Sequence, residues 1–131
     1  MDEMKYSVLV VDDHPLMRKG IVQLLELEDN IDVVGEASNG TDAVAMAKES
    51  EPDLILLDLN MKGLSGLDTL KALRAEEVTS RVVILTVSDA RQDVVALLKA
   101  GADGYLLKDT EPDMLLAQLA DVMTGKQILS E

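Results

Sequence analysis

Short apolar runs alternate along the chain with stretches whose apolar positions recur at helical spacing. Strands of a parallel sheet that are buried on both faces are nearly continuously apolar, whereas a helix on a sheet is apolar along one side. The pattern predicts strands at 6–11, 31–37, 53–57, 82–86 and 103–107, and helices at 15–28, 40–49, 66–74, 90–99 and 111–124. The strand at 31–37 is the most polar, which is typical of a sheet edge.

Strict alternation of five strands with five helices predicts parallel pairing, because the helices supply the crossover connections. Right-handed crossovers leave few arrangements, and we predict the doubly wound strand order 2-1-3-4-5. A length of 131 residues suits one such α/β domain with its own core.

Two of the apolar runs end abruptly in acidic residues. Val8–Val11 lead into Asp12 and Asp13, and Leu54–Leu57 lead into Asp58. In the predicted order the first and third strands are neighbours, and ligands bind beyond the carboxyl ends of the strands at this switch point. Solvated turn residues would explain one such strand end, but two adjacent ones favour a shared site.

Three carboxylates in one crevice repel each other, by about 4 kcal/mol per pair at 4 Å and an effective dielectric of 20. A divalent cation relieves this repulsion, and all-oxygen ligation favours Mg²⁺, Mn²⁺ or Ca²⁺. Thr86 and Lys108 end the fourth and fifth strands and are predicted to face the same crevice. There they would offer a hydroxyl donor and a positive charge to a phosphoryl group, although each alone is an ordinary strand or loop residue.

Composition narrows the class of partner. The formal net charge of −13 disfavours binding of nucleic acid by this chain itself, and the absence of cysteine excludes disulfides and thiolate metal sites. No apolar run is long enough to span a bilayer, and the acidic start is unlike a signal peptide. A cytoplasmic protein without membrane contact is expected.

The segments VVDDHP, LILLDLNM, ILTVSD and GADGYLLKD resemble, in order and spacing, the receiver domain of two-component response regulators. VVDDHPLMRKG and GADGYLLKD are further similar to the NarL/FixJ subfamily, and DLNMKGLSGLDTL with ILTVSDA to its nitrate/nitrite regulators. The resemblance covers essentially the whole chain. It implies the flavodoxin-like receiver fold and a switch domain that catalyses only its own phosphorylation and slow dephosphorylation.

The resemblance also implies a role for each candidate residue. Asp58 is the expected phosphoacceptor, with a phosphohistidine of a sensor histidine kinase as donor. The expected Mg²⁺ ligands, with Mn²⁺ as an alternative ion, are Asp12, Asp13, Asp58 and the backbone carbonyl of Asn60. Lys108 and Thr86 would stabilise the phosphoryl group. Thr86 would move toward it, and Tyr105 would then swing inward and change the face formed by the fourth helix, the fifth strand and the fifth helix.

Two positions depart from the common receiver pattern. Lys62 stands where a proline is common, and Asp109 follows Lys108 where many receivers have a proline, often cis. Neither departure touches the reacting groups. His14, the only histidine of the sequence, is expected to pack or hydrogen-bond locally rather than to carry a phosphoryl group.

Residues 1–125 are predicted to form the receiver and 126–131 to begin a linker. A helix-turn-helix domain is expected in the parent protein outside this chain, with DNA bound only through it and with homodimers formed on phosphorylation. Three alternatives remain at this point. They are a phosphorylation-independent receiver acting by protein contacts, an aspartate-nucleophile phosphohydrolase, and a flavodoxin-like binding module. Asn60 replaces the second acid that the phosphohydrolase requires, and the segment after Asp13 lacks the phosphate loop of the flavodoxin-like module.

Overall fold

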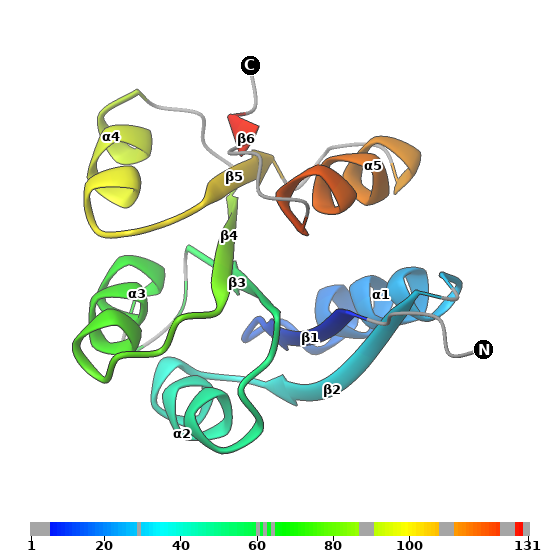
Figure 1. The fold of residues 1–131 in the computed structure, drawn as a ribbon, viewed down its shortest axis with the longest axis horizontal. Coiled ribbons are helices and arrows are strands. Elements are labelled where there is room, and N and C mark those ends of the chain that lie inside the picture. The colour runs from blue at the N-terminus through cyan, green and yellow to red at the C-terminus, as the bar shows by residue number, and fades with distance from the viewer. Residues whose placement is uncertain are drawn as a thin grey trace.

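The strands form one parallel sheet in the order β2-β1-β3-β4-β5-β6 (Figure 1). This computed structural model describes residues 6–28, 30–59, 61, 63, 65–86, 91–107, 112–123 and 128–129. The strands are β1 (Tyr6–Val11), β2 (Ile31–Ala37), β3 (Leu54–Asp58), β4 (Arg81–Thr86), β5 (Gly104–Leu107) and β6 (Ile128–Leu129). The helices are α1 (Pro15–Glu26), α2 (Gly40–Ser50), α3 (Gly66–Ala75), α4 (Arg91–Lys99) and α5 (Pro112–Met123). All ten predicted elements and the order 2-1-3-4-5 are confirmed.

One strand was not predicted. Ile128 and Leu129 form β6, which pairs in parallel with Gly104 and Tyr105 of β5. Both residues lie in the segment expected to begin a linker, and two apolar residues are too short a run to indicate a strand. The short strand β6, and not β5, therefore forms this edge of the sheet.

Helices cover both faces of the sheet, α1 and α5 on one and α2, α3 and α4 on the other (Figure 1). Successive strand residues point to opposite faces, so each strand feeds two aliphatic cores. The core under α2, α3 and α4 includes Leu9, Val11, Ile55, Leu57, Val82, Ile84 and Tyr105. The core under α1 and α5 includes Val8, Val10, Leu54, Leu56, Val83, Leu85 and Leu106. Burial on both faces explains why these strands are nearly continuously apolar.

Local signals in the sequence account for where several helices begin. Asn39 caps α2 by accepting a hydrogen bond from the backbone N–H of Asp42 at 2.8 Å. Ser65 caps α3 in the same way, through the N–H of Asp68 at 3.2 Å. Helix α1 begins at Pro15. A backbone N–H at the first position of a helix has no partner within the helix, so proline, which lacks this N–H, is well tolerated there.

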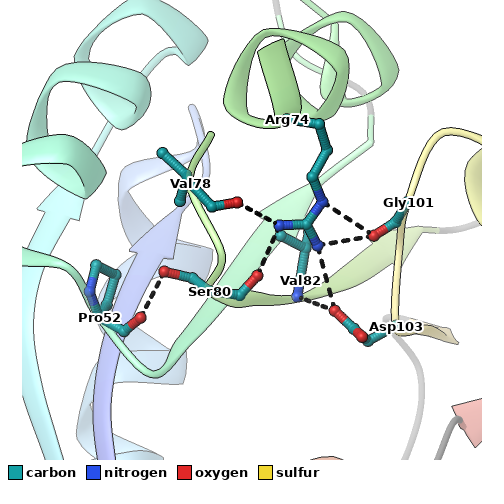
Figure 2. Close-up of polar contacts among 7 residues, drawn as sticks. All are labelled: Pro52, Arg74, Val78, Ser80, Val82, Gly101 and Asp103. Carbon is teal, nitrogen blue, oxygen red and sulfur yellow. Dashed lines mark hydrogen bonds and ion pairs between the residues drawn. The ribbon is translucent and has the colours of Figure 1, made fainter. Parts of the chain in front are cut away.

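Arg74, in the last turn of α3, ties three segments together (Figure 2). Its Nη1 donates hydrogen bonds to the backbone carbonyls of Val78 at 2.7 Å and Ser80 at 2.9 Å. Its Nη2 donates to the carbonyl of Gly101 at 2.7 Å and pairs with the Asp103 carboxylate at 3.3 Å. The guanidinium group therefore links α3 and the segment before β4 to the turn between α4 and β5.

Asp103 also sets how β5 lies against β4. Its N–H donates to the carbonyl of Val82 at 2.8 Å, and its carboxylate accepts the N–H of Val82 at 2.8 Å. The pairing continues with Tyr105 opposite Ile84. A shift of one residue would turn Tyr105 to the other face of the sheet, so these contacts help to fix the side on which the Tyr105 ring is buried.

A hollow of about 520 Å³ lies near the amino-terminal ends of β3 and β4. Its wall contains several acidic side chains, and two of them, Asp53 and Glu76, are bound by neighbouring residues. Asp53 accepts hydrogen bonds from the N–H and hydroxyl of Ser7 at 2.8 and 3.1 Å, and Glu76 pairs with Lys48 at 2.6 Å. These pairings support a structural role for this end of the sheet.

The Lys48–Glu76 pair gives a testable pH dependence. The hydrogen bond from the Lys48 ammonium, and then its charge, hold the pKa of Glu76 below its ordinary value. A lowered pKa means that the pair stabilises the fold above the ordinary glutamate pKa and stops doing so as the pH falls through the lowered value. In Lys48→Met we expect the pKa of Glu76, followed by carboxyl NMR, to rise to its ordinary value. An unchanged Glu76 pKa in this variant would show that Lys48 does not cause the lowering.

Candidate functional site

The sheet brings the three predicted carboxylates together, as the sequence indicated. β1 and β3 pair with Val11 opposite Leu57, so Asp12 and Asp58 each lie one residue beyond this pair. The side chains of Asp12 and Asp58 are fully buried, and that of Asp13 is 18% exposed. Their candidate ligand atoms and that of His14 all lie within 4.8 Å of one another.

His14 contacts this acidic cluster through both its backbone and its ring. Its N–H donates to Asp12 Oδ1 at 2.8 Å, and its Nδ1 lies 3.1 Å from the same oxygen. Nδ1 also lies 3.0 Å from Asp13 Oδ1 and 3.8 Å from Asp58 Oδ2. The predicted local hydrogen bonding of His14 is confirmed. Its approach to all three carboxylates was missed, although the adjacency of the residues in Asp12-Asp13-His14 was a signal for it.

The backbone after β3 holds Asp58 in place. The N–H of Leu59 donates to the carbonyl of Leu85 at 2.9 Å, and the N–H of Gly66 donates to the carbonyl of Leu59 at 2.9 Å. A Cβ at position 66 would lie 2.5 Å from the Asp58 carbonyl oxygen and from the Leu59 Cα. Only glycine therefore allows the start of α3 to pack this closely against the backbone that carries Asp58.

Arg18 supports the same region from α1, and sequence reasoning did not identify it. Its Nη1 donates to the backbone carbonyl of Asp12 at 2.9 Å, and its Nε pairs with Glu36 of β2 at 3.1 Å. Because the acceptor at Asp12 is a backbone atom, no residue type in the sequence marks this contact. Arg18 thus holds the backbone at the end of β1.

Thr86 and Tyr105 lie where the sequence placed them, at the end of β4 and within β5. Both are buried, with 1% and 6% of their surface exposed. Ile84, two residues before Thr86, pairs with Tyr105, so the Thr86 and Tyr105 side chains lie on the same face of the sheet. The Tyr105 ring packs in the core under α2, α3 and α4. The expected inward movement of Tyr105 on phosphorylation stays a prediction.

Four residues of the sequence analysis lie outside the described residues. They are Asn60, Lys62, Lys108 and Asp109. The predicted Mg²⁺ contact of the Asn60 carbonyl and the predicted phosphoryl contact of Lys108 therefore stay predictions.

The acidic cluster has the composition of a site for a hard divalent cation. Its carboxylate oxygens come from two neighbouring strand ends, and two of the three side chains are fully buried. Carboxylates taken out of water need a nearby positive charge or hydrogen-bond donors. Carboxylate oxygen is also the donor that Mg²⁺, Mn²⁺ and Ca²⁺ prefer. The residues present therefore fit a divalent cation.

Comparison with known proteins agrees with this arrangement. The family model of the response regulator receiver domain matches residues 8–120. The chain belongs to the receiver domain family of response regulators. Within it, this receiver is of the NarL/NarP type, as the NarL/FixJ resemblance implied, because its curated relatives include NarP and NarL proteins at 56% and 50% identity.

Two relatives and one solved structure give the extent of the similarity. The receiver is 61% identical over 127 residues to a nitrate/nitrite response regulator homologue of Haemophilus influenzae, covering 97% of this chain and 61% of the relative. It is 56% identical to NarP of Escherichia coli, covering 96% of this chain and 59% of NarP. The signal receiver domain of NarL from Mycobacterium tuberculosis superposes with a TM-score of 0.90 at 37% identity, over 95% of this chain and 100% of that one. The receiver thus spans about three fifths of the length of these curated relatives.

Among the described residues, none of the helices has the length and apolar character needed to cross a bilayer.

Proposed function

We propose that this receiver accepts a phosphoryl group on Asp58 from a phosphohistidine of a sensor histidine kinase. The observation that carries the proposal is the convergence of Asp12, Asp13 and Asp58 at the carboxyl ends of β1 and β3, with ligand atoms within 4.8 Å. This is the edge at which doubly wound sheets bind their ligands.

The chemistry that this site must perform is a displacement at phosphorus. An Asp58 carboxylate oxygen forms a bond to phosphorus while the phosphorus–nitrogen bond of phosphohistidine breaks, and the imidazole leaves with the electron pair. Asp12, Asp13 and Asp58 would hold Mg²⁺ or Mn²⁺, which supplies charge neutralisation for the phosphoryl oxygens. Leu59, Leu85 and Gly66 hold the backbone of the nucleophile through the contacts described above. Lys108 remains the predicted second positive charge.

The test uses the chain as it is, with acetyl phosphate as a small donor and intact mass as the readout. We expect a gain of one phosphoryl group in Mg²⁺ and none with EDTA, because the carboxylates alone repel the anionic donor. Absence of any gain would favour a receiver that acts by protein contacts alone. Rapid release of inorganic phosphate with turnover would favour the phosphohydrolase alternative.

Phosphorylation is proposed to act through Thr86 and Tyr105. Since the Tyr105 ring is already buried, the phosphoryl group would shift the population toward a ring position that exists beforehand. With 3-fluorotyrosine in a Tyr6→Phe background, the ¹⁹F signal of Tyr105 should move or sharpen on phosphorylation. In Thr86→Ala it should stay at the unphosphorylated position even when the mass shows full phosphorylation. Equal shifts in both proteins would remove Thr86 from the coupling.

At the level of the parent protein we propose a transcription regulator of nitrate or nitrite signalling, in which the kinase senses the ion. Support comes from the Haemophilus influenzae and Escherichia coli relatives, which are nitrate/nitrite response regulators. A linker after β6 would then lead to a helix-turn-helix domain, and phosphorylation would favour homodimers. Phosphorylation of this receiver by candidate kinases, compared by initial rate, would identify the cognate kinase.

A further inference from the structure

His14 sits at the N-cap of α1, but its side chain makes no capping hydrogen bond to that helix. The ring points instead to the acidic cluster, with Nδ1 at 3.1 Å from Asp12, 3.0 Å from Asp13 and 3.8 Å from Asp58. One ring nitrogen thus faces all three carboxylates that the proposed function assigns to the cation. The His14 side chain is 64% exposed, so its ring can adjust without repacking the core.

These distances agree with those between neighbouring ligands of one ion. In an octahedral shell with bonds of about 2.1 Å, adjacent ligand atoms lie about 3.0 Å apart and opposite ones about 4.2 Å apart. The spacings of Nδ1 to Asp12 and Asp13 match adjacent positions, and its spacing to Asp58 falls between the two values. A cation among the carboxylates could therefore reach Nδ1 after a small movement of the ring.

We propose that His14 Nδ1 is a fourth protein ligand of the cation site and that it shifts the selectivity of this site toward borderline transition metals. This inference rests on the proposed function, which supplies the cation site itself. An imidazole nitrogen suits Co²⁺, Ni²⁺ and Zn²⁺, whereas Mg²⁺ prefers oxygen and retains several of its waters. His14 therefore adds strongly to the binding of Co²⁺, Ni²⁺ and Zn²⁺ and little to that of Mg²⁺.

The contacts allow the ring to be removed without dismantling the site. The His14 N–H that holds Asp12 Oδ1 at 2.8 Å is a backbone group and is kept in His14→Ala. The Arg18 contact to the Asp12 carbonyl does not involve the His14 side chain either. The variant therefore isolates the nitrogen ligand. Leu16→Ala is the matched control, because Leu16 is 88% exposed in the first turn of α1 and contributes no ligand.

The experiment compares Co²⁺ and Mg²⁺ binding by titration calorimetry at one fixed pH, in the wild type, His14→Ala and Leu16→Ala. We expect His14→Ala to weaken Co²⁺ binding about tenfold or more while Mg²⁺ affinity changes less than about twofold. Leu16→Ala should change neither. Because His14 is the only histidine of the sequence, its ring signals in Co²⁺-loaded wild type have a single source. A very large contact shift of the exchangeable ring N–H distinguishes ligation by the ring from its mere proximity to the ion.

Each other outcome has a defined meaning. Equal changes in Co²⁺ and Mg²⁺ affinity, unchanged or tighter Co²⁺ binding in His14→Ala, or a ring N–H without a very large contact shift would overturn the role of His14 and leave the carboxylate site intact. No binding of either ion by the wild type would overturn the cation site of the proposed function together with this inference.

Discussion

Asp58→Asn is expected to abolish phosphoryl acceptance and, without divalent cations, to stabilise the fold. Asp12 and Asp58 are both fully buried, with ligand oxygens no more than 4.8 Å apart. At that separation two carboxylates repel by about 3.5 kcal/mol with an effective dielectric of 20. Neighbouring donors offset part of this repulsion, so the free energy of unfolding should rise by about 1–3 kcal/mol. Urea unfolding in EDTA measures the gain, and intact mass after acetyl phosphate measures acceptance.

Magnesium should reduce the stability advantage of Asp58→Asn over the wild type, and should reverse it where that advantage is smaller than the difference between their gains from the ion. At an ion concentration of 100 times the dissociation constant, the wild type gains about 2.7 kcal/mol, and the variant, with one carboxylate fewer, gains less. Asp32→Asn is the control, because Asp32 is exposed and lies near the opposite end of the sheet. In the register of β1 and β2 its backbone lies opposite Ser7. A full phosphoryl gain in Asp58→Asn would show that another residue is the acceptor.

Arg74→Met is expected to lower the free energy of unfolding by about 2–4 kcal/mol, because it leaves several acceptors without their donor. The carbonyls of Val78, Ser80 and Gly101 all receive hydrogen bonds from this guanidinium group (Figure 2). The Arg74 side chain is 27% exposed, so water replaces some of these contacts and keeps the loss below the sum of its parts. Methionine retains the aliphatic packing, and urea unfolding gives the difference.

Two further variants separate the guanidinium group from its charge. Arg74→Lys keeps the charge, but a single ammonium group cannot bridge the three carbonyls, so an intermediate loss is expected. Lys71→Met removes an exposed charge from the same helix and should change the free energy of unfolding by less than about 0.5 kcal/mol. Equal effects of Arg74→Met and Lys71→Met would show that the contacts in Figure 2 add nothing to stability.

The acidic cluster could be predicted from the sequence because it depends on strand order alone. Apolar runs ending in Asp12 and Asp58, placed on neighbouring parallel strands, must bring both side chains to one edge. The contacts of Arg74 and Arg18 could not be predicted in this way. Most of the acceptors in these contacts are backbone carbonyls. Every residue carries a backbone carbonyl, so the residue types in the sequence do not indicate these contacts.

The burial of Tyr105 was also beyond the sequence. A tyrosine in a short apolar run followed by polar residues is compatible with either an exposed or an enclosed ring. Its enclosure depends on the register of β5 against β4, to which Asp103 contributes through two hydrogen bonds to Val82. Register of this kind arises from contacts between distant segments, and a single strand sequence specifies it weakly.

The glycine at position 66 has a kinetic consequence for the proposed chemistry. Because Gly66 has no side chain, the start of α3 packs directly against the backbone of Asp58. The backbone of the proposed nucleophile is therefore fixed before a donor binds. A nucleophile whose backbone is already fixed loses less conformational freedom on reaching the transition state. A small donor such as acetyl phosphate would still lose its own translational and rotational freedom, so the fixed backbone would lower only the protein's share of the entropic barrier.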